Sequence, residues 1–476
     1  MISSFFIRIR RIKLVFLKFL LAVFSIIILP VSCGVQTFQS YTSQSVGALK
    51  ENISKLSLGH NEEPRSIRPL VSLLDSSVAA VELNGNFLQI MKTAVMFDPA
   101  IVAAKEDYLA QETAVKVSHT AKKFQVSGSV YGGIEDVSEK SSGIALVLTA
   151  NRLVYDGGAL ESRITSEIWG AEASRYGLIS RVDRRAVELA GFWVDLERYQ
   201  TLKDKIDTRL KILGPLFDQL EKVAEAGLGD VTKVSAAQRT VAAVKVTKTD
   251  ISNKLQQAQI NFENAFGSLP GDTRFDISFV EGLMPTSTAA DIRISAPAIQ
   301  ADYASYKSAE ANLSYIEAKY NFNVGFESSV TRPFGGSSSD SDESIGLIAR
   351  KTLYNGNKAS LEIKHANTRV KSSIAKLQAS YRDGTRRVQN SLKSIGTLNE
   401  AMNIAEKNAA ITQSEINNLR QQLIIGESTL DSVLSGEARL FEAEAKVINF
   451  KADKIKLQIE VLGALGLLSN KFDITF

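Results

Sequence analysis

Two segments of the chain alternate between apolar and polar residues, which is the period of a β-strand. The first places apolar or small residues at every second position, at Phe124, Val126, Gly128 and Val130. The second places Phe322, Val324, Phe326 and Val330 on alternating positions, with Ser328 between the last two. A further apolar segment follows each one, over 144–155 and 345–354, after a loop rich in Gly, Ser, Asp and Glu. The pattern therefore predicts two strand pairs, at 123–155 and 321–354.

The period lengthens to three or four residues after each strand pair, which predicts helix. The two segments concerned, 158–226 and 357–425, are each 69 residues long. As helices they would extend for about 100 Å. Apolar residues in the first of them are spaced as in a coiled-coil seam, for example at Leu189, Trp193, Leu196, Tyr199 and Leu202.

Glycines mark the points where these elements change direction. Gly157, Gly158 and Gly356 stand at the strand-to-helix turns, where glycine allows a positive φ. Further glycines, Gly227 and Gly426, stand where the long helices end and a second helical pattern begins. We therefore expect two antiparallel helical hairpins, over 158–266 and 357–466.

The same landmarks occur twice, about 198 to 199 residues apart. Recurring pairs are Pro99 and Pro297, Tyr155 and Tyr354, Gly227 and Gly426, and Gly267 and Gly466. An offset held over so long a stretch indicates a tandem duplication, whose copies must adopt equivalent structures. The expected division is repeat 1 at 81–267, an equatorial segment at 268–296, repeat 2 at 297–468 and a C-terminal tail at 469–476.

The N-terminal segment has the pattern of an export signal. Basic residues precede an apolar run over 14–29, and Cys33, the one cysteine of the chain, follows that run. We expect a signal peptide at 1–33 and an extended leader at 34–80, rich in Ser, Thr, Gln and Asn. Cys33 is a candidate for lipidation. Ordinary cleavage close by and an uncleaved anchor are the alternatives.

Composition argues against catalytic and nucleic-acid-binding functions. The net charge is only +4, and the chain has three histidines and one cysteine. These give no basic footprint for nucleic acid and little material for a zinc site or a Cys/His nucleophile. Acidic residues are scattered along helix positions, as on a solvated face. We therefore expect no enzyme, no catalytic residues, no cofactor and no metal.

Four strands and two helical hairpins would leave strand edges open and apolar stripes unburied. Three copies would supply 12 strands, an even number that can close into a barrel above a ring of long helices. The alternation of these strands of about ten residues fits either the half-buried sheet of a soluble domain or a transmembrane barrel, and the long helices of each repeat favour the barrel. The expected fold is therefore an α+β membrane protein, a homotrimer whose 12-stranded β-barrel continues into an α-helical barrel.

Several motifs recur in a fixed order and spacing, at 98–101, 153–158, 227–231, 265–267, 426–433 and 464–466. Because of these motifs, residues 81–468 resemble the TolC family of outer-membrane efflux proteins. The resemblance implies a trimeric channel-tunnel in the outer membrane of a Gram-negative bacterium, with most of the chain in the periplasm. It further implies an exit duct for type I secretion or drug efflux. The partners would be outer-membrane lipid, a periplasmic adaptor and an inner-membrane pump of the ABC or RND type.

The resemblance also assigns roles to residues at the hairpin tips. Adaptor docking would fall to Gly227, Gly229, Asp230, Gly426, Glu427 and Thr429. Aspartates narrow the entrance in the family, but here Ser432 and Ser435 take the matching positions, with Asp431 beside them. Asp431 is therefore the gate candidate.

Two other functions also use long helical hairpins. A periplasmic adaptor would have one hairpin flanked by compact β-rich domains, whereas this chain has two hairpins, each preceded by a strand pair. A structural coiled-coil protein of the envelope would not need the strand pairs. The duplication therefore favours the duct over both alternatives.

Overall fold

The computed structural model describes residues 85–136, 141–226, 231–271, 273–284, 294–334, 342–472 and 474. The chain divides into two units, Met1–Ser76 and Ser77–Phe476, and every described residue belongs to the second. The expected signal peptide, the leader and Cys33 lie outside the described residues.

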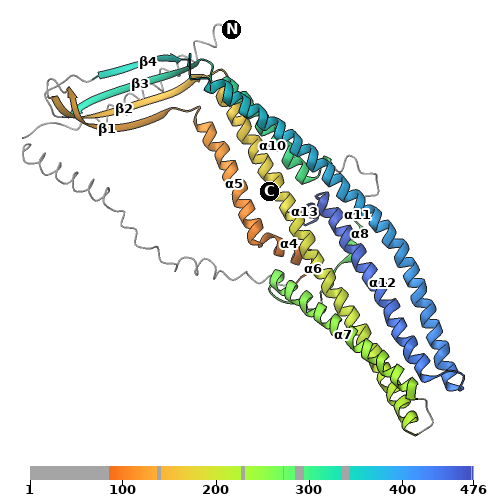
Figure 1. Ribbon diagram of the computed structural model, residues 1–476. Helices are drawn as coiled ribbons and strands as arrows, with labels where there is room; N and C mark the ends of the chain where they lie inside the picture. Colours follow the sequence, from red (N-terminus) through yellow and green to blue (C-terminus); the bar gives the residue numbers. More distant parts are fainter. Residues whose placement is uncertain are drawn as a thin grey trace, which may run out of the picture. The chain divides into compact units, whose positions relative to one another are not determined.

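The strands form a single antiparallel sheet in the order β1-β2-β3-β4 (Figure 1). Their bounds are Gln125–Asp136 for β1, Ser141–Tyr155 for β2, Asn323–Phe334 for β3 and Asp342–Arg350 for β4. Because β2 pairs with β3, the strand pairs of the two repeats share the sheet. β1 and β4 are its edges, and each has one unpaired side.

The strands differ from the sequence prediction at both ends. Toward the loops they are longer than expected, because backbone pairing continues through small residues such as Gly132, which lies opposite Ile144. At the other end, β4 stops at Arg350, four residues before the predicted end. Leu353 and Tyr354 are 91% and 87% exposed. Among the described strands, β4 pairs only with β3, whereas β2 pairs with both β1 and β3. Residues 351–354 therefore have no described strand on their other side to keep them in the sheet.

Each repeat contributes a short helix, a long helix and a returning helix. In repeat 1 these are α5 (Pro99–Thr120), α6 (Ala159–Glu225) and α7 (Val231–Phe266). In repeat 2 they are α10 (Pro297–Ala318), α11 (Lys358–Ile424) and α12 (Leu430–Ala464). Both long helices contain 67 residues and begin within one residue of the predicted position. The equivalence of the two copies is therefore present in the helices as well as in the strands.

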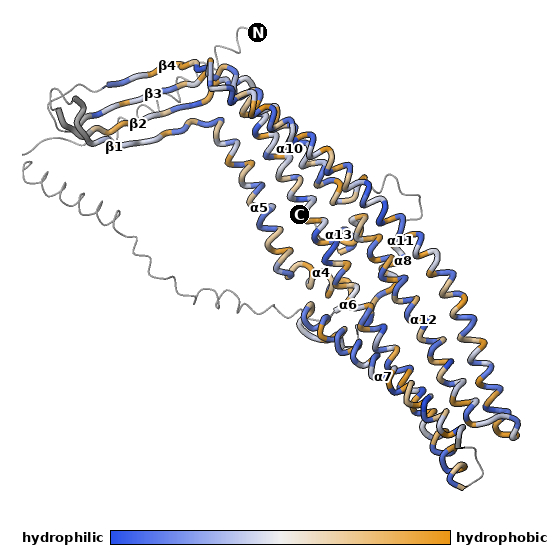
Figure 2. Tube along the Cα trace, viewed as in Figure 1, coloured by the Kyte–Doolittle hydropathy of each residue, from blue (hydrophilic) through white to orange (hydrophobic). Residues whose placement is uncertain are grey.

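The helices of the two repeats pack against one another. α6 contacts α7 and α5 of its own repeat and also α10 and α12 of the other, while α11 contacts α10 and α12. Hydrophilic and hydrophobic residues are interleaved along α11 and α12 (Figure 2). Within the described residues, no single helix is long and apolar enough to cross a membrane. α4 (Phe87–Met96) and α5 pass that test only as a pair, which is bent by 61°.

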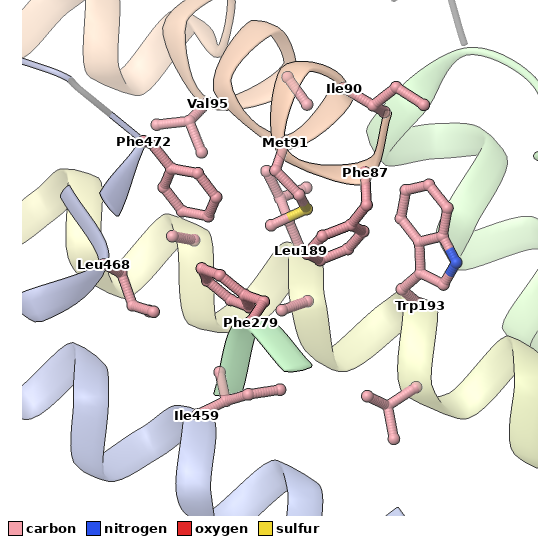
Figure 3. Close-up of a cluster of buried hydrophobic side chains, with 14 of the residues drawn as sticks. Phe87, Ile90, Met91, Val95, Leu189, Trp193, Phe279, Ile459, Leu468 and Phe472 are labelled. Carbon is pink, nitrogen blue, oxygen red and sulfur yellow. The ribbon is translucent and has the colours of Figure 1, made fainter. Parts of the chain in front are cut away.

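The largest hydrophobic cluster surrounds the middle of α6 (Figure 3). Trp193 is fully buried there, and its ring meets those of Phe87, Phe262 and Phe266 edge-on at centroid distances of 5.2, 5.1 and 5.5 Å. Such edge-to-face pairs stabilise beyond the area that they bury. α4, whose N-cap is Asn86, and α8 (Ile277–Glu281) belong to this cluster and had not been predicted.

The C-terminal residues are part of this core, although a tail was expected at 469–476. Helix α13 (Leu467–Lys471) begins just after Gly466, whose φ is 74°. Leu468, Phe472 and Ile474 are buried in the cluster. The sequence does not reveal this burial, because these apolar residues have no periodic neighbours and pack on surfaces that only the fold provides.

A buried carboxylate on α6 holds the start of α13. Asp183 Oδ1 accepts a hydrogen bond from the backbone N–H of Ser469 at 2.8 Å, and Oδ2 accepts one from the Ser469 hydroxyl at 3.2 Å. Burial raises the pKa of Asp183 to about 7, against the lowering effect of these hydrogen bonds. The folded protein therefore retains a proton that the unfolded chain releases above about pH 4.

Because the folded state holds this proton more tightly, Asp183 should make the free energy of unfolding fall as pH rises from about 4 to about 7, and then level off. Over this pH range Asp183 should change the free energy of unfolding by roughly 4 kcal/mol. Asp183→Asn keeps a hydrogen-bonding side chain that does not titrate, so it should remove this part of the pH dependence. The difference between wild type and variant in denaturant unfolding, measured across that pH range, checks this. A constant difference would contradict it.

Candidate functional site

The sheet has one mainly apolar face that no other described element covers. Side chains alternate along each strand, and, although the register shifts once between β1 and β2 and once between β2 and β3, the pairing places most of the apolar positions of the four strands on this face. They are Val126, Val130, Leu146, Leu148, Ala150, Val324, Phe326, Val330, Ile345, Leu347 and Ala349. Val126, Val130 and Leu347 remain 64%, 69% and 68% exposed. Ser328 and the Arg332–Glu343 pair also lie on this face, but its surface is otherwise apolar, and an exposed apolar surface marks contact with a partner or with lipid.

The opposite face of the sheet is mainly polar. It carries Gln125, Ser127, Ser129, Thr149, Asn151, Glu327, Ser329, Thr331, Ser344 and Arg350. Arg350 donates two hydrogen bonds to the Glu327 carboxylate, at 2.5 and 3.0 Å, and the hydroxyls of Ser329 and Ser344 lie 2.7 Å apart. Cross-strand pairs of this kind stabilise a sheet surface in contact with water.

The strand-to-helix turns have left-handed backbone in both repeats. Gly157 and Gly158 have φ of 68° and 85°, and Gly356 has 63°. Asn357, the counterpart of Gly158, is the one described non-glycine residue with a positive φ, at 68°. Asp156 stabilises the start of α6, because its carboxylate accepts hydrogen bonds from the backbone N–H groups of Gly158 and Leu160 at 3.0 and 2.6 Å.

Only the tip of the second hairpin can be described, since Gly227, Gly229 and Asp230 lie outside the described residues. Gly426 has a φ of 82° and ends α11 in a turn, in which the Glu427 N–H donates to the carbonyl of Gln422 at 2.8 Å. Thr429 is the N-cap of α12, and its hydroxyl oxygen accepts from the Ser432 N–H at 3.3 Å. The candidate docking residues of this tip thus form one compact turn.

Asp431 lies in the first turn of α12, where a carboxylate is stabilised by the helix dipole. Its side chain is half-buried, one residue before Ser432 and four before Ser435. The two apolar residues that end the neighbouring helix, Ile424 and Ile425, are exposed. The tip therefore combines exposed apolar surface with acidic groups.

A buried charge network behind this tip joins the two repeats. Glu437 on α12 is 0% exposed, and its Oε2 accepts from Arg209 Nη1 of α6 at 2.7 Å. Its Oε1 accepts from Arg420 Nη2 of α11. The second guanidinium nitrogen of Arg209 donates to Glu444 at 3.1 Å, and so does Lys205. One carboxylate thus connects α6, α11 and α12.

The sequence pattern does not reveal this network. Glu437 and Glu444 are seven residues apart, so they share one face of α12, but the same spacing occurs on solvated helix faces. Gly436 lets α11 approach closely, because a Cβ there would lie 3.1 Å from Ile416. Within the part of the chain that the structure describes, no group of three or more His, Cys, Asp or Glu residues could hold a metal ion.

No family model and no curated protein matches the sequence. Solved structures do match. The structure of the outer membrane protein VceC from Vibrio cholerae has a TM-score of 0.69 at 15% identity, with 80% of this chain and 96% of that chain covered. The structure of the MtrE outer membrane channel of Neisseria gonorrhoeae, in its open state, has a TM-score of 0.70 at 14% identity. The match covers 80% of this chain and 88% of that chain. The chain has the fold of these outer-membrane channels.

A third match is a crystal structure of CusC, a protein whose folding and transmembrane channel formation are accompanied by conformational changes. Its TM-score is 0.70 at 14% identity, with 79% of this chain and 91% of that chain covered. These likenesses confirm the fold expected from the TolC-family resemblance, namely long helices with a small antiparallel sheet. They extend over nearly the whole length of each matched chain, so they include both repeats.

Glu437→Ala should lower the free energy of unfolding by about 3–5 kcal/mol, because it leaves the buried Arg209 with one carboxylate fewer. The matched control is Arg439→Ala, which removes an exposed pair with Glu415 between the same two helices, α11 and α12. That change should cost less than about 1 kcal/mol. Denaturant unfolding of the detergent-solubilised protein measures both. Equal losses would mean that the buried network does not stabilise the fold.

Proposed function

We propose that the protein is a passive exit duct in the outer membrane of a Gram-negative bacterium. The observation that carries the proposal is the sheet, whose uncovered apolar face suits lipid and whose polar face suits a water-filled lumen. Strands of 12, 15, 12 and 9 residues are long enough to cross the hydrocarbon layer when tilted. The fold shared with outer-membrane channels supports the same function.

The working form would be a homotrimer. The free edges of β1 and β4 can pair between chains, and three four-stranded sheets would close a barrel of 12 strands. The helices would continue it as an α-helical barrel. Ile404 and Ile411 of α11 and its C-cap Ile425 support this, because they are spaced by multiples of seven residues and are 69%, 68% and 68% exposed in one chain. A neighbouring chain would cover such a stripe.

Most of the chain would then lie in the periplasm, with the hairpin tips directed at the partners. A periplasmic adaptor would dock on the two tips, through Gly227, Gly229 and Asp230 of the first and Gly426, Glu427 and Thr429 of the second. An inner-membrane pump, of the ABC type in secretion or the RND type in efflux, would drive transport. A lipid on Cys33 would add an anchor in the outer membrane.

The continuous sheet disfavours the alternatives of an adaptor or a structural coiled coil. Neither function needs a sheet with a lipid-compatible face, and such a surface would favour aggregation of a periplasmic protein. A duct uses both faces of the sheet, both open edges and both hairpins.

Neighbouring residues of β1 test this function, because Val130 and Ser129 lie on opposite faces of the sheet. Val130→Arg should cost about 2–4 kcal/mol on insertion into lipid, whereas Ser129→Arg would place the same charge in the lumen. We expect wild type and Ser129→Arg to insert into vesicles, conduct ions and give a trimer by native mass spectrometry. Val130→Arg should fail to insert.

Equal insertion of the two variants would contradict a lipid-facing apolar surface. A stable monomer in the mass spectrum would contradict closure by three chains. The same spectrum, recorded on protein extracted from outer membranes, shows whether the mature chain begins at Cys33 with an added lipid mass.

Asp431 is proposed as the gate residue at the periplasmic entrance. Three copies, one from each chain, would concentrate negative charge there and bind multivalent cations. Asp431→Ala should therefore weaken block by divalent cations in single-channel recordings, while Asp250→Ala, which removes an exposed carboxylate from the middle of α7, should leave the block unchanged. Block that persists in Asp431→Ala would remove this residue from the entrance.

A further inference from the structure

Two aromatic rings at one end of the sheet each have a cation placed over them. The Arg152 guanidinium carbon lies 5.2 Å from the ring centroid of Phe124. The Lys351 ammonium nitrogen lies 4.9 Å from the ring centroid of Phe322. Both distances are within the range of cation–π attraction.

The two pairs are equivalent positions of the duplicated repeats. Phe322 follows Phe124 by 198 residues, and Lys351 follows Arg152 by 199, the offsets that relate the repeats elsewhere. The chemistry is the same in both copies, although one cation is arginine and the other lysine. An aromatic ring with a cation is therefore a feature of the repeat rather than of one site.

Both pairs lie where the sheet joins the helices. Phe124 and Phe322 stand between the ends of α5 and α10 and the first residues of β1 and β3. Arg152 is three residues before the end of β2, and Lys351 directly follows β4. By register Arg152 lies opposite Phe326, whose ring meets that of Phe124 edge-on at 5.7 Å. The aromatic–cation pairs thus border the helix-side end of the apolar face.

These cations differ from the other charged residues of the sheet. Arg350, on the polar face, is bound to Glu327, and Arg332, near the loops, pairs with Glu343 at 3.1 Å. Within the described residues, no ion pair involves Arg152 or Lys351, and both are exposed. An aromatic ring orients a cation without neutralising its charge, so both residues can still bind an anion.

We propose that each pair binds the phosphate of a phospholipid headgroup at the periplasmic boundary of the membrane. The cation would contact the phosphate, and the acyl chains would lie along apolar residues such as Val126 and Leu347. Free phosphate lacks chains to cover this surface, which favours the lipid as occupant. The inference rests on the proposed function, since it takes the apolar face to be in lipid.

The expected strength follows from the attraction of basic residues to an anionic surface. One cation at such a surface strengthens binding about fivefold. The two pairs are separate sites, so loss of the cation should weaken binding of an anionic headgroup about fivefold at each site. Because the attraction is electrostatic, it requires anionic headgroups and weakens with salt.

The test uses the full chain reconstituted in vesicles of phosphatidylcholine alone or mixed with phosphatidylglycerol. Native mass spectrometry of protein released from these vesicles counts the retained lipids. Wild type should retain phosphatidylglycerol in preference to phosphatidylcholine, and the double variant Arg152→Gln with Lys351→Gln should lose that preference. The control, Lys371→Gln with Lys407→Gln, removes the same charge from exposed positions on α11 and should behave as wild type.

The readouts separate this inference from the proposed function. Failure of the wild type to insert and conduct would contradict the duct itself. If the wild type inserts but the Arg152/Lys351 variant retains as much phosphatidylglycerol as the wild type does, that result would contradict binding of headgroups by these two cations. Inorganic phosphate that displaces the bound lipid at low millimolar concentration would likewise contradict a lipid site. Phe124→Leu with Phe322→Leu should weaken the preference less than loss of the cations does.

Discussion

Backbone hydrogen bonds between β2 and β3 join the two repeats, along a register that begins with Ile144 opposite Phe334 and ends with Tyr155 opposite Val324. This ladder, with the two beside it, places most apolar positions of the four strands on one face, because side chains alternate with a period of two. It also brings the starts of α6 and α11 to the same end of the sheet (Figure 1). The two faces of the sheet, its free edges and the cation–aromatic pairs all depend on this register.

The helices are held by two kinds of interaction at different points along their length. Around the middle of α6, aromatic and aliphatic side chains from α4, α8 and α13 form a compact core about Trp193. Nearer the tips, where the helices have fewer neighbours, a smaller apolar cluster includes Leu213, Leu434 and Phe441, and the carboxylate of Glu437 connects three helices. A shift of one helix along another would separate the buried carboxylate from its partners, so the ion pairs disfavour such a shift.

Much of the fold could be predicted because the elements are long and strictly periodic. A helix of 67 residues repeats its pattern many times, and the duplication provides a second copy against which every boundary can be checked. The strand-to-helix turns could be located because glycine tolerates the positive φ that they require. The prediction failed where a short element depends on a distant surface: α4, α8 and α13 have too few residues for a period to be detected.

The sequence by itself determined the duplication, the order of strands and long helices, and the two-faced character of each strand, because these are local patterns. Only the tertiary structure decided that β2 pairs with β3, that Asp183 binds Ser469 of α13, and that Arg209 and Arg420 converge on Glu437. These contacts join residues as many as 286 positions apart. Their partners are set by how whole elements pack, and a charged residue of such a pair has the same local pattern as one on a solvated face.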